Sequence, residues 1–270
     1  IFLADAAHVH SPTGGQGLNS GIQDAFNLCW KLSLVHKGLQ DGSINSNRLM
    51  YTYTEERVRV VKAMLNITTN LLKRTFGANP GGKPSRSGIA FIRGFELRMF
   101  GINYRGSPIV LDEVDPPAEV LDPYNMSADE PVRGGDRAPQ AVGLKVLCGL
   151  SFTSTAHTAL VFAGSIESLE LVRSLVRALT KYPHGMMRIM IVHSPEGEPE
   201  LVLEVQDTEG HAYASYLRGL DQSGLPASGS ERKGPVVVIV RADGHVGVIV
   251  KDAEGVDRCC LRSRGLSNKL

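Results

Sequence analysis

The sequence opens with IFLADAAHVHSPTGGQGLNSGIQDAFNLCWKL, residues 1–32, in which a glycine-rich turn runs directly into a helical pattern. The apolar residues at the start predict a strand that ends at Asp5. Over residues 19–37, apolar side chains such as Ile22 and Phe26 recur at spacings of three and four, which predicts a helix with one apolar face. The glycines therefore lie at the N-terminus of the predicted helix.

The turn itself, SPTGGQGLN over residues 11–19, predicts a binding site for an anion or an electron-rich carbonyl. A helix N-terminus presents backbone N–H groups without partners inside the helix, together with the positive end of the helix dipole. Gly14, Gly15 and Gly17 carry no side chains that would keep a ligand from these donors, and Pro12 makes the approach rigid. A surface loop that only leads into an amphipathic helix is the alternative, because glycine loops are common.

Composition limits the class of protein. The 270 residues, 42% apolar and 21% charged, are typical of a soluble globular protein with a substantial core. A net charge of +1 argues against binding to nucleic acid or an anionic membrane, and no apolar run is long enough to span a bilayer. Four cysteines without a C-x-x-C pair favour a reducing, cytoplasmic location and indicate no zinc site. Because the first residue is an Ile inside a strand-like run, the chain is interpreted as the C-terminal portion of a longer protein.

The rest of the N-terminal part, residues 1–112, is predicted to be mostly helical. A second helix is expected from about Asn47, its N-cap, to Phe76, followed by a glycine- and proline-rich loop and a third helix over residues 89–100. Prolines and acidic residues are then dense over residues 113–139, which favours an extended connector rather than a packed element. A domain boundary is predicted in this connector.

The last part, residues 140–270, has an α/β pattern. Expected elements are a strand over 158–164, a helix over 165–182, a parallel strand over 187–193, a short helix near 210–217 and a hairpin of the strands 235–241 and 246–252. Asp243-Gly244 is the turn signal of that hairpin. This order of elements predicts a thioredoxin-like domain, and without C-x-x-C it has no dithiol to exchange, so a role in packing or subunit contact is expected.

The string from Asp5 to Lys31 closely resembles the second flavin-binding motif of the FAD-dependent aromatic hydroxylases, the group of para-hydroxybenzoate and phenol hydroxylases. Further similarity lies in YTEERVRVVKAML, INYRGSPIV, GGDRAPQAVGL, TALVFAG and VVVIVRADGHVGVI, the last three looking like the thioredoxin-like tail of phenol-hydroxylase-type members. The resemblance implies the C-terminal part of a FAD-dependent monooxygenase fold, a mostly helical remainder followed by a thioredoxin-like α/β domain.

Carried over to the matching positions, the resemblance implies that FAD is bound by Asp5, Pro12, Gly14, Gly15, Gly17, Leu18 and Asn19. The Asp5 carboxylate would accept hydrogen bonds from the ribityl chain, and the backbone from Gly14 to Gly17 would pass beside the isoalloxazine ring. The N–H groups of Leu18 and Asn19 would point at the flavin N1/C2=O edge, where negative charge develops on reduction. Pro12 would lie near the aromatic substrate. No residue of the chain is nominated as a catalytic acid or base.

The implied function is hydroxylation of a phenol-type aromatic by O2, with FAD as cofactor and NADPH or NADH as electron donor; a homodimer is compatible with the resemblance. Two departures stand out: Ala4 replaces the usual glycine, and no G-x-G-x-x-G turn for the FAD pyrophosphate occurs. The chain alone is therefore expected to bind FAD weakly or not at all and not to turn over. The alternative is a non-catalytic, truncated relative that acts as a structural or protein-interaction module through its thioredoxin-like domain. A metal site at His8 and His10 is disfavoured because a third ligand is lacking.

Overall fold

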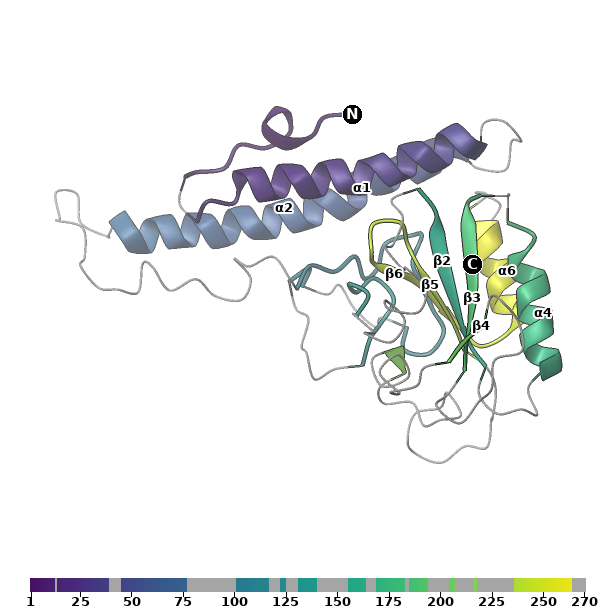
Figure 1. The fold of residues 1–270 in the computed structure, drawn as a ribbon. Coiled ribbons are helices and arrows are strands. Elements are labelled where there is room, and N and C mark those ends of the chain that lie inside the picture. The colour runs from purple at the N-terminus through teal and green to yellow at the C-terminus, as the bar shows by residue number, and fades with distance from the viewer. Residues whose placement is uncertain are drawn as a thin grey trace.

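The computed structural model of the chain describes residues 1–12, 14–38, 45–76, 101–116, 122–124, 131–139, 155–163, 169–182, 185–193, 204–206, 216–217 and 236–263. Its helical elements are η1 (Ala4–Ala6, a 3-10 turn), α1 (Gly17–Gly38), α2 (Ser46–Phe76), α4 (Leu169–Leu179) and α6 (Ala253–Ser263). Its strands are β1 (Leu111–Asp112), β2 (His157–Phe162), β3 (Met187–His193), β4 (Glu204–Gln206), β5 (Val236–Val240) and β6 (Val246–Val250). Figure 1 shows a pair of long helices lying across one end of the strands of a mixed sheet.

The two long helices, α1 and α2, lie side by side and run in opposite directions (Figure 1). Both were predicted, and their bounds agree with the prediction to within two residues. Asn45, rather than Asn47, caps α2, because its Oδ1 accepts a hydrogen bond of 3.1 Å from the backbone N–H of Arg48. The loop predicted over residues 77–88 and the helix predicted over 89–100 lie outside the described residues.

The sheet has the strand order β1-β6-β5-β2-β3-β4. β2 and β3 are parallel, as predicted, with α4 between them in sequence. β5 and β6 form the predicted antiparallel hairpin, and β5 also pairs antiparallel with β2. Gly244 has a φ of +77° in the turn, which accounts for the glycine there. The predicted short helix near 210–217 lies largely outside the described residues.

Both faces of the sheet are covered, so its central strands are continuous apolar runs. Alternate residues of β2, Ala159 and Val161, pack under α4 and α6 on one face. Leu160 and Phe162 point to the other face, where Ala138 and other buried residues from outside the strands cover them. The helix α6 had not been predicted, and its packing on the first face completes that core layer.

The described part of the predicted connector is packed. Residues 131–139 contain no helix and no strand beyond an isolated bridge, which agrees with an extended segment. However, Asp136 is buried and accepts hydrogen bonds from Arg105 Nε and Nη2 at 2.6 and 2.8 Å, and Gly135 N–H donates to Val246 O at 2.7 Å. The acidic residue lies inside because a buried guanidinium neutralises it. The division into residues 1–112, 113–139 and 140–270 stays a prediction.

The helical pair contacts the sheet through a small apolar cluster: Trp30 and Leu34 of α1, Leu49 of α2, Met186 and Ala242. The ring of His157, the first residue of β2, lies edge-on to Trp30 with 5.4 Å between ring centroids. Burial and the neighbouring charge of Arg241 lower the pKa of His157 to about 4. This imidazole is therefore neutral in the folded protein at neutral pH.

Acid should weaken the fold through His157. The unfolded chain binds a proton on this imidazole near pH 6.5, whereas the folded chain binds it only near pH 4, so the unfolded state holds more protons between these values. We expect the free energy of unfolding to fall by about 1.4 kcal/mol per pH unit across this window from this group alone. Urea unfolding at several pH values should show a shallower loss in His157→Phe than in the wild type. Identical slopes would contradict the assignment.

Candidate functional site

The glycine turn precedes α1, which begins at Gly17. Gly14 and Gly15 have φ values of +90° and +64°, conformations that favour glycine. The turn is closed by a 3.1 Å hydrogen bond from Gly15 N–H to Pro12 O, and the Gln16 side chain donates to Gly14 O at 2.9 Å. A Cβ atom placed on Gly15 would meet nothing within 4 Å. The turn is thus held in shape while its Gly15 side stays open.

The N-terminus of α1 keeps its donor character. Its first turn contains no acidic residue, so no carboxylate of that turn neutralises the positive end of the helix. The first N–H groups of a helix have no partner inside it, and these include those of Leu18 and Asn19. Both residues are exposed, as are Asp5 and Pro12. The predicted site residues therefore occupy the accessible parts of η1, the turn and the first turn of α1.

The strand predicted to end at Asp5 is not formed. Leu3 is extended, with φ −147° and ψ 162°, but residues 4–6 form the 3-10 turn η1. A strand needs a hydrogen-bonded neighbour, and no described strand pairs with residues 1–3. Asp5 consequently lies on a short turn against α1 rather than at a strand end.

The turn η1 is attached to α1 by Asp24, a residue of the motif to which no role had been given. Its Oδ2 accepts a 3.0 Å hydrogen bond from Ala4 N–H and lies 2.6 Å from His8 Nε2, and its Oδ1 accepts 2.6 Å from Arg57 Nε on α2. Burial alone would raise the pKa of Asp24, but Arg57 and these hydrogen bonds outweigh it and lower that pKa. An ionised Asp24 thereby joins η1, α1 and α2.

Ala4, the residue that replaces the usual glycine of the motif, has a left-handed φ of +50°. Its methyl group faces α1, where a Cβ on Gly21 would come within 3.0 Å of the Cβ of Ala4. Left-handed backbone is unfavourable for alanine by about 1–2 kcal/mol, which gives a backbone reason for glycine at this position. The methyl group of Ala4 lies between η1 and α1.

Ala4→Gly should therefore stabilise the protein. The left-handed strain is relieved, while the added freedom of glycine in the unfolded chain offsets part of the gain, leaving about 0.5–1 kcal/mol. The midpoint of urea unfolding should rise accordingly. Ala6, two residues later in η1, has no positive φ, so Ala6→Gly should lower the midpoint of urea unfolding. A higher midpoint in both Ala4→Gly and Ala6→Gly would contradict the argument.

A second buried polar cluster lies further along α1, and we call it the Glu56 cluster: Asn27, Lys31, Glu56, Ser107, Arg241 and Asp243. The Glu56 carboxylate accepts five hydrogen bonds, from Ser107 Oγ and Arg241 Nη1 on Oε1, and from Asn27, Lys31 and Arg241 Nη2 on Oε2, at 2.7–3.0 Å. Burial opposes ionisation, but Arg241 and Lys31 lower the pKa of Glu56 to about 2. The carboxylate is therefore charged throughout the physiological range.

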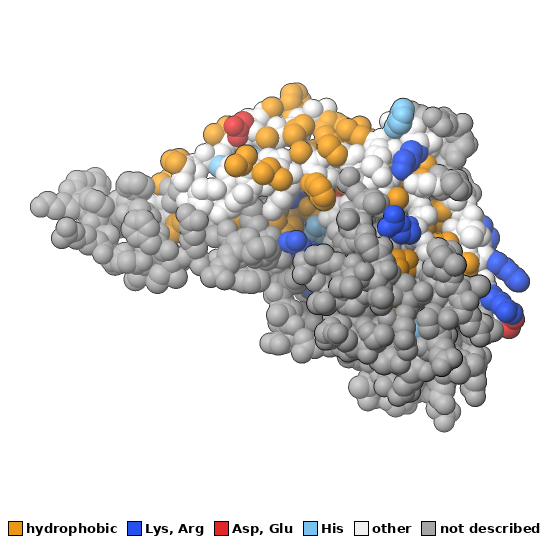
Figure 2. Space-filling view, in the orientation of Figure 1, with side chains coloured by type: hydrophobic (Ala, Val, Ile, Leu, Met, Phe, Trp, Pro, Cys, Tyr) orange, Lys and Arg blue, Asp and Glu red, His pale blue; other side chains and the backbone are white. Residues whose placement is uncertain are grey.

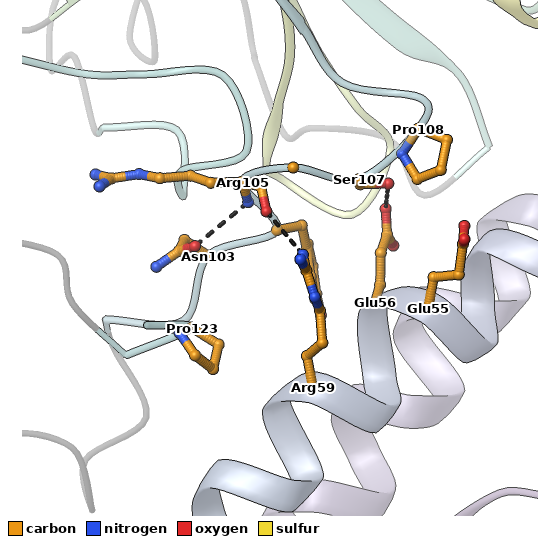
Figure 3. Close-up of a pocket in the computed structure, with 10 residues that line it drawn as sticks. Glu55, Glu56, Arg59, Asn103, Arg105, Ser107, Pro108 and Pro123 are labelled. Atoms are coloured by element: carbon orange, nitrogen blue, oxygen red, sulfur yellow. Dashed lines mark hydrogen bonds between the residues drawn. The ribbon is translucent and has the colours of Figure 1, made fainter. Parts of the chain in front are cut away.

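A pocket of about 230 Å³ lies beside this cluster, between α2 and the segment 103–108 (Figure 3). Arg59 crosses it to donate a 3.1 Å hydrogen bond to Arg105 O, and Glu56 on the same helix reaches Ser107. Its lining contains none of the residues of η1 or the glycine turn. The pocket is separate from the predicted cofactor site.

Only part of the predicted apolar face of α1 is buried: Trp30 packs inside, whereas Ile22 and Phe26 are exposed and several polar side chains of the helix are buried. Ile22 and Phe26 are 57% and 51% exposed, whereas Asp24, Asn27 and Lys31 are buried against α2 and its neighbours. Figure 2 shows hydrophobic side chains gathered over η1 and α1. We call this set the α1 apolar stripe: Leu18, Ile22 and Phe26, spaced by four residues. The described residues leave this stripe exposed, although Trp30 and Leu34 further along α1 are buried.

Comparison with known proteins agrees with the motif. Residues 1–68 match the family described as FAD binding domain. A flavin-dependent monooxygenase of Mycobacteroides abscessus is 36% identical over 159 residues, 57% of this chain and 27% of that protein. Pentachlorophenol 4-monooxygenase of Sphingobium chlorophenolicum is 43% identical over 82 residues, 30% of this chain and 14% of that protein. The resemblance to the FAD-dependent aromatic hydroxylases is confirmed.

A solved structure of similar fold covers nearly the whole chain. The solved structure of native and K252c-bound RebC-10x is 26% identical, with a TM-score of 0.59, over 98% of this chain and 45% of that chain. The expected mixed α/β architecture is thus confirmed, whereas the thioredoxin-like domain stays a prediction. In each of these three comparisons the match covers less than half of the relative's own length. No described helix is both long and apolar enough to cross a membrane.

The residues around the turn fit the flavin that the hydroxylases bind. His10 Nδ1 and Ser11 Oγ, next to the turn, are buried polar atoms that have no hydrogen-bond partner among the described residues, which leaves them available to a polar ligand. His8 is committed to Asp24, and the described residues contain no group of three side chains able to hold a metal ion. An open Gly15, a helix N-terminus and unpaired polar atoms together suit a flat, hydrogen-bonding cofactor.

Proposed function

We propose that this chain forms the flavin-facing part of a monooxygenase that hydroxylates a phenol-type aromatic compound with O2 and NADPH or NADH. The observation that carries the proposal is the open glycine turn at the N-terminus of α1, in a segment that matches FAD binding domains. Two relatives are named pentachlorophenol 4-monooxygenase and 2,4-dichlorophenol 6-monooxygenase, which favours a phenol-type substrate.

Each predicted site residue has a role in this proposal. The exposed Asp5 carboxylate accepts hydrogen bonds from ribityl hydroxyl groups, and Gly14, Gly15 and Gly17 let the ring approach the backbone. The N–H groups of Leu18 and Asn19 stabilise negative charge at the N1/C2=O edge. Bound FAD supplies the activation and transfer of oxygen, with NADPH as electron donor. Pro12 lies at the substrate side of the turn, and no acid or base of this chain is required.

We assign the sheet and its helices to a thioredoxin-like domain. The unit β2-α4-β3 is parallel, and the antiparallel pair β5-β6 and helix α6 follow it. Since the sequence contains no C-x-x-C, we assign it a packing role, including contact between subunits of a homodimer. We also place the protein in the cytoplasm, on its unpatterned cysteines.

The α1 apolar stripe fits this proposal. Leu18, Ile22 and Phe26 begin at the turn itself and would otherwise face water, although buried packing of such side chains is favourable by about 1.5–3 kcal/mol each. A flavin site is enclosed by protein on more than one side. We therefore expect the stripe to contact the rest of that enclosure.

A FAD titration tests the proposal. The 270-residue chain and the longest natural polypeptide that contains it are each titrated with FAD while the flavin fluorescence is recorded. We expect the longer polypeptide to bind FAD and quench its fluorescence, and we expect the 270-residue chain alone to bind FAD weakly or not at all. Gly15→Val in the longer polypeptide should weaken binding at least tenfold, since it fills the open side and disfavours the left-handed φ.

Gly185→Val is the matched control, because Gly185 has a similar φ of +79° and equally open surroundings far from the turn in sequence. Its FAD affinity should equal that of the wild type. Phenols should also stimulate NADPH oxidation by the longer polypeptide. Absence of any FAD binding would reject the proposal and favour a non-catalytic, structural or protein-binding relative, which the lack of G-x-G-x-x-G already makes the second candidate.

A further inference from the structure

Arg241, directly after β5, connects the sheet to the helical pair. Its Nη1 and Nη2 donate to the two oxygens of Glu56 on α2 at 2.7 and 3.0 Å, and its Nε donates to Asp243 Oδ1 at 3.0 Å. All three side chains are at most 3% exposed. A bidentate pair of this kind fixes both distance and orientation between the elements that carry it.

The same guanidinium also touches α1. Its carbon lies 4.8 Å from the ring centroid of Trp30 on α1 and 5.1 Å from that of Tyr104. Through Glu56, the guanidinium is also linked to Asn27 and Lys31 of α1, because both side chains donate hydrogen bonds to the same carboxylate. Arg241 therefore contacts α1 directly through the Trp30 ring and indirectly through the Glu56 carboxylate.

These contacts define the rotation and the axial position of α1. Asp24, Asn27 and Lys31 are spaced by three and four residues, so one face of the helix is clamped at three successive levels. Asp24 is held by Arg57, and the two levels below it are held by Glu56. A helix is stiff over this length, so a rotation at Lys31 also rotates the N–H groups at its start.

We propose that Arg241 is a positioning residue for the flavin site, through which the C-terminal sheet sets the orientation of α1 and hence of its N-terminal donors. The effect on FAD binding rests on the proposed function, whereas the contacts of Arg241 with Glu56 and Trp30 lie outside the glycine turn. Arg241 touches no residue that we assign to the cofactor, and acts on them only through Glu56, Trp30 and the body of α1.

The charges of the Glu56 cluster make it possible to separate two effects of Arg241: the orientation of α1 and the overall stability of the fold. The pairs of the cluster, Lys31 and Arg241 against Glu56 and Asp243, sum to zero, so removing Arg241 leaves one buried negative charge in excess. Glu56→Gln in the same chain restores the balance without restoring the bidentate bridge. Stability and orientation of α1 therefore respond differently to the single and the double substitution.

The experiment uses the longest natural polypeptide and measures FAD affinity, thermal unfolding and amide hydrogen exchange over residues 20–34 of α1. Arg241→Met should raise the Kd for FAD at least tenfold and accelerate exchange in α1 at least tenfold. Arg241→Met with Glu56→Gln should recover much of the lost Tm but keep the raised Kd. Arg241→Lys, which keeps the charge, should fold even where Arg241→Met does not, and should show an intermediate Kd.

Arg258→Met is the control, because Arg258, in the middle of α6, forms a 2.7 Å pair with Glu113 that is partly exposed to solvent. It should leave Kd and exchange within twofold of the wild type. Unchanged Kd and exchange in the Arg241 variants would overturn the inference, as would a Kd that recovers together with Tm in the double variant. If the wild type binds no FAD, the proposed function fails, and exchange in α1 alone then decides whether Arg241 positions this helix.

Discussion

Glu56→Leu is expected to lower the free energy of unfolding by about 3–5 kcal/mol, the usual effect of removing one partner from a buried ion pair. The substitution removes the acceptor that Lys31, Asn27 and Arg241 share. Arg241 keeps its pair with Asp243, so one buried positive charge is left in excess. Burial already lowers the pKa of Lys31 to about 8 even with Glu56 in place, which shows how poorly this environment favours an additional positive charge. Urea unfolding followed by circular dichroism measures the loss.

Glu55→Leu is a closely matched comparison, one residue earlier on α2. Among the described residues, the buried oxygen Oε2 of the Glu55 carboxylate has no hydrogen-bond partner, so leucine would remove little at this position. We expect a change within about 0.5 kcal/mol. Equal losses in the two variants would mean that any substitution at this side of α2 disturbs the helix, and that the five hydrogen bonds to Glu56 have no special importance.

The Glu56 cluster also shows where prediction from the sequence ends. Helices α1 and α2 and strands β2, β3, β5 and β6 were predictable because their apolar periodicity is local. Glu56 and Arg241 are 185 residues apart, and no local pattern brings them together. The available signal was the position of Arg241 and Asp243 beside a fully apolar strand, where a charge must be paired if it is buried.

Other elements were missed for different reasons. The helix α6 has the sequence AEGVDRCCLRS, which contains a glycine and few apolar residues, so its apolar pattern is too weak to identify it. Among its residues with described side chains, Val256 is fully buried. For α1, periodicity identified the helix but not the side that packs, because Asp24, Asn27 and Lys31 find partners inside. The glycine turn was predictable because helix-terminal chemistry depends on neighbouring residues only.

Gly135→Ala should have the largest effect of all, a loss of more than about 4 kcal/mol, which only a few kinds of substitution reach. Gly135 has a φ of +98°, and a Cβ there would lie 2.4 Å from Arg105 N and 2.6 Å from the carbonyl carbon of Tyr104. The backbone has little room to move away, because Gly135 N–H donates to Val246 O at 2.7 Å and Gly135 O accepts from Tyr104 N–H at 2.8 Å. Tm and urea unfolding measure the loss.

Gly185→Ala separates backbone strain from collision. Gly185 has a left-handed φ of +79°, but a Cβ there meets nothing within 4 Å, so only the conformational cost of about 1–2 kcal/mol applies. The difference between the two variants then measures how tightly residues 131–139 are held between Tyr104, Arg105 and β6. A small difference would show that this proline- and acid-rich segment yields as a flexible linker would, whereas a large one establishes it as part of the packed core that joins the helical pair to the sheet.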